Sequence, residues 1–587
     1  MTGESEQTVP TTSAQALVHD LVEQFSNPLD FYRELIQNST DAGSNRIDVS
    51  LEYVEKGEEK GQAVIRVEDD GEGMDEHIID NFLLVLFRST KEDDFTKIGK
   101  FGIGFVSIFA IKPDLVRLLT AKSGESWRLD FPSYKRYDKY RVTEMRDGTL
   151  VELFKTMTRE EYDKLVRDSL ETIRYWCKHT ETRIFFQDRT QGGPPVSITE
   201  PFDLPGGASV VYREEGTQIL LGFSADAEPF FGFYNRGLTL KEGKKKFFSG
   251  VQLKVKSRYL EHTLTRDNVM EDENYQKLME ILTRIVHGEL RRKLQTELTD
   301  IAAKISFQAA GPAEDKKEVN VSLANEWKRR LPYFQWLLSG ILSRFKQQRK
   351  WPVFPTISGK PVSLVRLLEG IKEAGILYHD DQTNRITDAL KKQGIPVLVS
   401  GPWVSAVEMW CGGHLETAQA SARLIQPNVV SAAKLPSAVR AFLETLRSVD
   451  ANSGAKYQEI HFAAFEYAGS CIRDRFFVTQ KEAGALTQVD ERPRSSLFLF
   501  GKSRRVALLN QTNSFLQKLA AIHETRPGLA AYLCLKVLHL HDGTVPPDQE
   551  SRYCNLAEKV ELRLLQKALR LDEANSSQSR DGRVIPK

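Results

Sequence analysis

The sequence is poor in cysteine and has no long apolar run. Only 5 of its 587 residues are cysteine, and they are scattered and odd in number. We therefore expect reduced thiols in the cytosol rather than a disulfide scaffold. No run approaches the roughly 18 apolar residues that a membrane span needs. The first residues are polar and acidic, unlike the start of a signal peptide. We therefore expect a cytoplasmic protein with no membrane segment.

The chain also lacks an excess of charge of either sign. Lysine and arginine total 81 and aspartate and glutamate total 80, which gives a net charge of +1. Nucleic-acid binding usually leaves a basic excess, so it is not expected from the overall charge. The length leaves room for about three domains, each with its own core.

The first motif that is present predicts a helix with a polar face. A helix is expected to begin with Asn27 as its N-cap and to end before Gly43. Glu34, Asn38 and Asp41 are then spaced at i, i+4 and i+7, so they share one face. Taken alone, such a stripe is more often the solvated side of a surface helix.

The second motif is a strand that ends in an acid and alternating glycines. Residues 63–67 are mostly apolar and rich in β-branched side chains, which predicts the strand. Asp69, Gly71 and Gly73 follow it. Glycines at this spacing let the backbone approach a flat ligand, and the carboxylate can accept a hydrogen bond from an exocyclic amine. An Asp-Gly turn without a ligand is the plain alternative.

The third motif is the glycine-rich segment from Gly99 to Phe105, which leads into a helix-like run ending at Ile111. The free N–H groups at a helix start favour phosphate. No strand and βαβ unit precede the motif, so a nicotinamide site is not expected. No Gly-Lys-Ser/Thr follows either, so the motif is not a P-loop.

Together with residues 147–152 downstream, these motifs resemble the nucleotide-binding fold that DNA gyrase, heat-shock-protein-90 chaperones, histidine kinases and MutL share (the GHKL or Bergerat fold). Within that superfamily, residues 33–42 resemble the catalytic helix of the HtpG-type chaperones almost residue for residue. The resemblance extends over residues 14–155. The segment between Met74 and Gly99, which would be the lid over the nucleotide, is shorter than in the chaperones.

The resemblance implies an ATP hydrolase with ATP and Mg²⁺ as its cofactors. It makes Glu34 the general base, Asn38 the Mg²⁺ ligand and Asp69 the acid that reads adenine. The other nucleotide-binding positions that it implies are Asp41, Gly73, Met74, Lys91, Gly99, Lys100, Phe101, Gly102, Ile103, Gly104, Phe105 and Thr149.

A further resemblance lies downstream. Residues 264–269, with the helical run that follows to about residue 290, resemble the middle-domain segment that carries the family's γ-phosphate arginine. Arg266 is then the candidate for that second catalytic role, because an always-charged planar donor suits a transferring phosphoryl group. A surface arginine that caps a helix is the plain alternative.

The expected fold class is α/β (α+β), with an N-terminal Bergerat-fold ATP-binding sandwich, an α/β middle region and a helix-rich C-terminal dimerisation region. The expected segments are a mobile arm at 1–13, the ATP-binding domain at 14–190, a middle domain with Arg266 at 196–308, a second middle segment at 325–430, the dimerisation domain at 431–572 and a disordered tail at 574–587.

The resemblance implies a homodimeric clamp that uses ATP to remodel a protein client. A clamp on nucleic acid, similar to MutL, MORC-type or topoisomerase subunits and at work in a bacterial defence system, is the alternative. The short lid and the basic residues Lys244–Lys246 favour that alternative, and the neutral charge and the Arg266 segment favour the chaperone. A form that binds ATP without hydrolysing it is a third interpretation, and the presence of Glu34, Asn38 and Asp69 argues against it.

Overall fold

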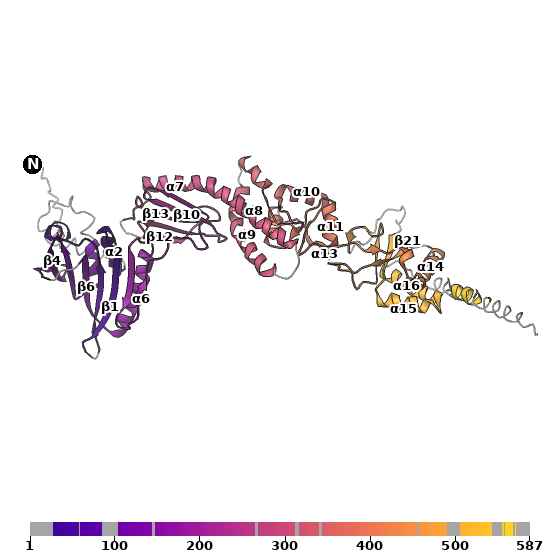
Figure 1. Cartoon of the computed structure of the whole chain (residues 1–587), viewed down its shortest axis with the longest axis horizontal. Coiled ribbons are helices and arrows are strands. Elements are labelled where there is room, and N and C mark those ends of the chain that lie inside the picture. Colours follow the sequence, from indigo (N-terminus) through magenta and orange to yellow (C-terminus); the bar gives the residue numbers. More distant parts are fainter. Residues whose placement is uncertain are drawn as a thin grey trace, which may run out of the picture. The chain divides into compact units, whose positions relative to one another are not determined.

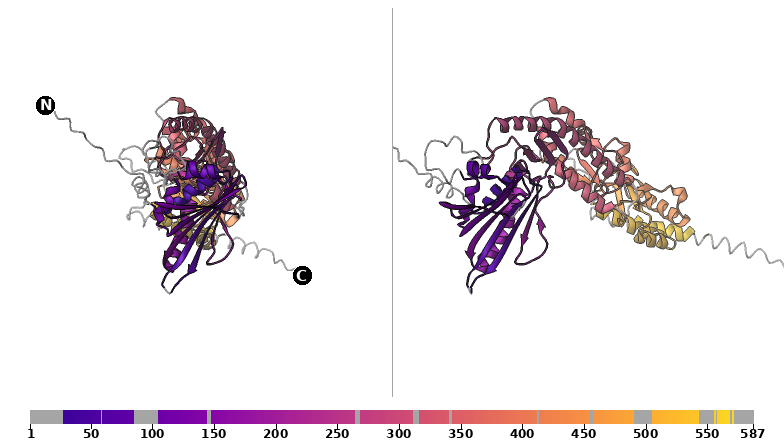
Figure 2. Two further views of the ribbon diagram at one scale, coloured as in Figure 1. Left: turned by 90° about the vertical axis from the view of Figure 1, so that its left-hand side faces the viewer. Right: turned by 60° about the vertical axis from the view of Figure 1, so that its left-hand side comes forward.

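The computed structural model describes residues 27–57, 59–84, 104–143, 147–263, 268–310, 316–339, 343–411, 413–454, 457–489, 505–542, 555–556, 558–567 and 570. The chain divides into two compact units. The first comprises Met1–Leu294 and Arg329–Trp336, and the second comprises Gln295–Lys328 and Leu337–Lys587. Both units contain helices and strands, which confirms the expected mixed α/β class (Figures 1 and 2).

The first unit is built on an eight-stranded, mostly antiparallel sheet with the order β5-β4-β3-β6-β2-β1-β7-β8. Only β1 and β7 pair in parallel. The strands are β1 Arg46–Glu55, β2 Gly61–Asp69, β3 Leu115–Lys122, β4 Glu125–Ser133, β5 Arg136–Arg141, β6 Thr149–Met157, β7 Arg183–Asp188 and β8 Val196–Ser197. The expected strand at residues 63–67 is therefore confirmed as the middle of β2.

Two long helices, α2 (Phe31–Asp41) and α6 (Arg159–Cys177), pack together against this sheet. Tyr32 is fully buried between them and donates a hydrogen bond to Ser169 Oγ at 3.0 Å. Shorter elements complete the layer: α3 (Glu76–Ile78), η1 (Ile79–Leu83) and η3 (Ser107–Ile111). The apolar side chains of α2, of the sheet and of η3 form one core.

The predicted start of the first helix is wrong by a few residues. Asn27 Oδ1 accepts from the N–H of Leu29 at 3.0 Å, and Asp30 N donates back to Asn27 O, so residues 27–30 close a turn. The α-helix begins only at Phe31, after this turn, and the predicted end before Gly43 is correct.

A second, five-stranded sheet follows in the same unit, with the order β12-β11-β13-β10-β9. Its edge strand β12 lies against α6 (Figure 1). The elements are β9 Val210–Glu214, β10 Thr217–Phe223, β11 Phe230–Asn235, β12 Leu238–Lys244 and β13 Val251–Ser257, followed by α7 Glu273–Ile285 and η4 Val286–Leu290. The next helix, α8 Arg291–Ala309, begins in the first unit and continues in the second unit from Gln295.

The second unit contains a small parallel sheet with the order β17-β16-β18, and a four-stranded sheet with the order β20-β21-β24-β22. Helices α14, α15 and α16 pack with the latter around one core. Helix α9 Lys316–Ser339 is divided between the units, because its residues Arg329–Trp336 belong to the first. The elements of the parallel sheet and its neighbours along the chain are η5 Ser343–Lys350, β14 Pro352–Phe354, β15 Val362–Ser363, α10 Leu364–Ala374, β16 Leu377–Asp380, α11 Arg385–Lys392, β17 Leu398–Val399, α12 Pro402–Trp410, β18 Thr417–Gln419 and α13 Ala420–Arg423. The remaining elements are β19 Leu424–Ile425, β20 Asn428–Val429, η6 Ala432–Lys434, α14 Ser437–Asn452, β21 Tyr457–Ala464, β22 Phe477–Gln480, β23 Thr487–Gln488, β24 Arg505–Asn510, α15 Ser514–His523 and α16 Pro527–Asp542.

Among the helices of the described ranges, none combines the length and the apolar character that a membrane crossing requires.

Candidate functional site

A hollow of about 320 Å³ opens beside α2, at the end of β2 and the start of β6. It brings together seven of the residues that the sequence singled out: Asn38, Asp41, Asp69, Gly73, Met74, Phe105 and Thr149. The other lining residues are Leu35, Ser39, Ala42, Val67, Glu72, Ile78, Phe82, Leu83, Leu118 and Val151.

Asp69, the last residue of β2, is the buried acid of this hollow and is only 8% exposed. Its Oδ2 accepts from Ser39 Oγ at 2.7 Å, and its Oδ1 accepts from the N–H groups of Gly71 and Thr149 at 2.9 and 3.3 Å. A carboxylate offers about two acceptor positions on each oxygen. Three are occupied by these donors, so Oδ2 retains one position for an N–H group of a ligand.

The wall beside Asp69 is fixed by Gly73 and by two threonines. Gly73 has φ of +66°, and a Cβ at this position would lie 2.1 Å from the carbonyl oxygen of Ala121, so only glycine fits. Met74 N donates to Thr120 Oγ1 at 2.9 Å, and the hydroxyls of Thr120 and Thr149 are 3.0 Å apart. The backbone at Gly73 and Met74 therefore borders the hollow in one defined conformation.

The structure places Glu34 beside the described end of the glycine motif. Glu34 is 6% exposed, and a Cβ on Gly104 would lie 2.5 Å from its Oε2. Residues 104–106 are helical, and Ser107 Oγ donates to Gly104 O at 2.6 Å. The carboxylate therefore lies against the first turn of the segment for which the sequence predicts phosphate binding.

Several predicted site residues cannot be placed in this geometry. Lys91, Gly99, Lys100, Phe101, Gly102, Ile103 and Arg266 lie outside the described residues.

Asn38 is the candidate metal ligand. Asn38 lines the hollow, and its carboxamide makes no hydrogen bond to any residue that the structure describes. In the same described ranges, no group of three or more His, Cys, Asp or Glu side chains is arranged to hold a metal. One amide oxygen fits Mg²⁺ bound chiefly through substrate phosphates and water, which is how this ion is usually held.

Most of the other lining residues of the hollow are apolar. Leu35, Val67, Leu118 and Val151 lie along it, and the ring of Phe82 stands at its rim with 49% exposure. An apolar cavity with a few convergent polar groups is the usual design of a small-molecule site, and a flat base suits it.

Two residues that hold the wall of the hollow in place were not singled out from the sequence. Ser39 lies within the helix motif, one residue after Asn38, so its position in the sequence could have indicated that it lies near Asp69. No motif in the sequence indicates Thr120. Its place beside the hollow follows from the pairing of β3 with β6, in which Thr120 lies opposite Thr149.

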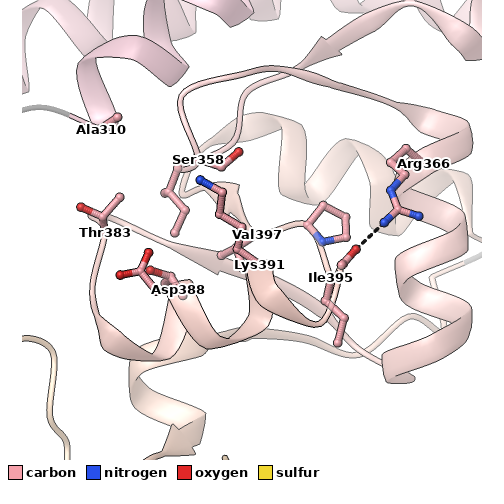
Figure 3. Close-up of a pocket in the computed structure, with 12 residues that line it drawn as sticks. Ala310, Ser358, Arg366, Thr383, Asp388, Lys391, Ile395 and Val397 are labelled. Carbon is pink, nitrogen blue, oxygen red and sulfur yellow. Dashed lines mark hydrogen bonds between the residues drawn. The ribbon is translucent and has the colours of Figure 1, made fainter.

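A second hollow of similar volume lies in the second unit, around α11 (Figure 3). Its charged lining residues Asp388, Lys391 and Arg366 are exposed. Arg366 already donates to Gly394 O at 2.5 Å, and buried Thr387 donates to Asn384 O at the start of α11. This hollow therefore has no buried acceptor comparable to Asp69.

Residues 32–160 match the family model described as "Histidine kinase-, DNA gyrase B-, and HSP90-like ATPase". This stretch runs from α2 to the start of α6 and contains every described residue of the hollow. The fold and the match together define a GHKL ATPase domain at the N-terminus.

Three of the relatives that match part of this chain are a chaperone and two mismatch repair proteins. The DNA mismatch repair protein MutL of Endomicrobium trichonymphae is 31% identical over 175 residues, which cover 28% of this chain and 27% of the relative. The chaperone protein HtpG of Chlorobium luteolum is 32% identical over 139 residues, which cover 19% of this chain and 22% of the relative. The MutL of Thermosipho africanus is 28% identical over 140 residues, covering 22% and 23%.

The chain thus spans about a quarter of the length of the relatives it matches. The comparisons support the GHKL superfamily. They do not favour the HtpG-type chaperones over MutL, so the narrower resemblance stated from the sequence is supported only at the level of the superfamily.

Proposed function

We propose that the chain binds Mg²⁺-ATP in the hollow beside α2 and hydrolyses it. The observation that carries this proposal is the buried carboxylate of Asp69, which is held by three donors and keeps one acceptor position toward an apolar hollow. The exocyclic amine of adenine supplies the matching donor, and the apolar walls accept the flat base.

In this proposal each residue of the site has one task. Glu34 takes a proton from the attacking water, which requires its carboxylate within about 3 Å of that water. Asn38 would hold Mg²⁺, which would neutralise charge on the phosphates. Gly104 and Phe105 present backbone at the phosphate end, and Arg266 stabilises the departing γ-phosphate.

Replacing Glu34 tests the hydrolysis step. Glu34→Ala should lower ATP turnover by about 10²-fold or more, the usual loss for a general base, because no other described carboxylate lies against Gly104. Binding of ATP, measured by calorimetry on the same protein, should stay near the wild-type value. Undiminished turnover in this variant would remove Glu34 from the mechanism.

We further propose that turnover drives a homodimeric clamp on a protein client. The support is the resemblance of residues 33–42 to the HtpG-type helix, and the HtpG relative. Residues 431–572 would join the two copies. This region has exposed apolar side chains, which favour an interface: Phe515, Ile522, Leu540, Leu562, Leu564 and Leu565. Light scattering of the whole chain should give a dimer, and a monomer with and without a non-hydrolysable ATP analogue would contradict the clamp.

A clamp on nucleic acid is the second candidate, and one surface feature favours it. Lys244, Lys245 and Lys246 are consecutive and exposed, and they form no ion pair with a described residue. Glu242 in the same segment is turned inward, to Lys178 at 2.7 Å. Several of the relatives are MutL proteins.

DNA binding at several salt concentrations separates the two candidates. Phosphate contacts by these lysines would give an affinity that falls steeply with salt. The variant with all three lysines changed to glutamine would lose that dependence. The chaperone proposal expects no DNA binding at physiological salt by either protein.

A further inference from the structure

The second sheet reaches the mouth of the hollow through one side chain. Arg236 lies in the turn between β11 and β12, and its Nη1 donates to Asp41 Oδ1 at 2.9 Å. Asp41 is the last residue of α2 and lines the hollow, with its side chain 27% exposed. The ion pair therefore lies where the hollow opens to solvent.

The turn that carries Arg236 has a defined backbone conformation and packs against two neighbouring segments. Arg236 has φ of +48°, which is uncommon for a residue with a side chain. A Cβ on Gly237 would lie 2.0 Å from His179 O, so the turn sits directly on the chain that follows α6. Asn235 Nδ2 donates to Leu260 O at 2.8 Å and ties the other side of the turn to the segment that follows β13.

Strand β12 is anchored to α6 by two further contacts. Lys178 and Glu242 form an ion pair at 2.7 Å, with the Glu242 side chain only 10% exposed. Thr239 Oγ1 donates to Tyr175 O at 2.6 Å. The position of Arg236 relative to Asp41 is therefore set by packed and hydrogen-bonded structure along β12.

The charges around the hollow give this contact a consequence for a phosphate-bearing ligand. The described acids of the hollow are Asp41, Asp69 and Glu72. Glu72 is paired with Lys122 at 2.9 Å, and Asp69 is held by neutral donors. Without Arg236, the carboxylate of Asp41 would stand at the mouth as an uncompensated negative charge and would repel an anionic ligand.

We propose that Arg236 is an electrostatic positioning residue for nucleotide binding, contributed by the second sheet to the hollow of the ATPase domain. It neutralises Asp41, so that the mouth carries no uncompensated negative charge from this carboxylate. This inference rests on the proposed function, because it concerns the affinity of the same hollow for a charged nucleotide. It assigns to the second sheet a role in nucleotide binding before any hydrolysis.

The test is calorimetric titration of the whole chain with ATP, ADP and adenosine. Arg236→Ala should weaken ATP binding about fivefold, as expected for a partly exposed charge interaction, and ADP binding less. Adenosine carries no phosphate, so its affinity should not change. Arg236→Lys should restore most of the ATP affinity, because it keeps the charge.

The variant Asp41→Asn tests the other residue of the ion pair. Asp41→Asn removes the carboxylate that Arg236 neutralises, so this variant should not weaken ATP binding. In the Asp41→Asn background, Arg236→Ala should therefore lower the ATP affinity less than it does in the wild-type chain. The matched control is Arg258→Ala. Arg258 is an exposed arginine at the end of β13 in the same sheet and pairs with Glu215 at 2.9 Å, outside the hollow. This control should leave the affinity for all three ligands unchanged.

The outcomes separate the inference from the proposed function. A wild-type protein that binds neither ATP nor adenosine overturns both. A wild-type protein that binds ATP, with Arg236→Ala equal to it, overturns the role of Arg236 and leaves the proposed function intact. An equal loss of ATP and adenosine affinity in Arg236→Ala, without recovery in Arg236→Lys, also overturns the inference, because it would reflect a disturbed fold.

Discussion

At the scale of single residues, Glu34 and Gly104 define the space in which hydrolysis is proposed to occur. The backbone of Gly104 passes so close to the carboxylate that a Cβ would lie 2.5 Å from Oε2 and 3.5 Å from Cδ of Glu34. Even a methyl group at position 104 must therefore displace the carboxylate or the turn. Asp69, Gly73 and Thr149 do not take part in this contact.

Gly104→Ala should consequently lower ATP turnover while leaving adenosine affinity near the wild-type value. A displacement of a catalytic group by about 1 Å costs up to about 10²-fold in rate. Steady-state kinetics measure the turnover, and calorimetric titration measures the adenosine affinity. Gly288→Ala is the matched control, since nothing lies within 4 Å of its added Cβ. Normal turnover in Gly104→Ala would show that the carboxylate is not confined as described.

The residues of the hollow differ in how visible they are in the sequence. Asn38, Asp69 and Gly73 belong to short motifs whose spacing follows from one helix and one strand end, so they could be predicted. Thr120 could not, because its place depends on the pairing of β3 with β6. The Arg236–Asp41 contact joins residues 195 positions apart and has no local signal either.

At the scale of elements, strand β2 and the end of α2 followed from local pattern, whereas the start of α2 did not. The turn at residues 27–30 uses the same Asn-Pro signal that begins helices, and tertiary packing of Phe31 and Tyr32 sets the first helical residue. The order of the eight strands depends on long-range pairing, which the sequence does not state.

The contact between α6 and the second sheet contains a buried histidine. His179 is 4% exposed, and its Nδ1–H donates to Glu200 O at 3.2 Å. Its Nε2 accepts from Lys254 Nζ at 2.9 Å, so the ring is neutral. Burial, and after it the charge of Lys254, lower the pKa of His179 to about 4.

This histidine should make the first unit sensitive to acid. The unfolded chain binds a proton at His179 below about pH 6.5, whereas the folded chain does so only near pH 4. Stability should therefore fall as the pH drops through this window, by up to ~1.4 kcal/mol per pH unit for one proton. Thermal unfolding at pH 7.5, 6 and 5 measures the slope.

His179→Gln is the variant that isolates the effect. It removes the titrating group, so its melting temperature should depend less on pH between 6.5 and 4 than that of the wild-type protein. Equal slopes for the two proteins would contradict the assignment of this proton to His179.

At the scale of the whole molecule, the first unit carries the ATPase domain and the second sheet together. The described residues on either side of Arg266 also belong here, since Thr263 N donates to Asn268 O at 2.9 Å and Lys241 Nζ donates to Asn268 Oδ1 at 3.0 Å. The parts proposed for binding, hydrolysis and phosphate sensing therefore belong to one compact unit. The clamp adds a second copy of the chain to this unit.

The central claim is that the hollow beside α2 binds an adenine nucleotide through Asp69, and titration of ATP into the wild-type chain and Asp69→Asn tests it most directly. In the variant, an amide oxygen that accepts from Gly71 and Thr149 directs its NH₂ group toward Ser39 and the base, so two donors would face each other. We predict saturable ATP binding by the wild-type chain and none by an Asp69→Asn protein with an unchanged melting temperature. Equal ATP affinity in the two proteins, or no binding by the wild-type chain, would contradict the account.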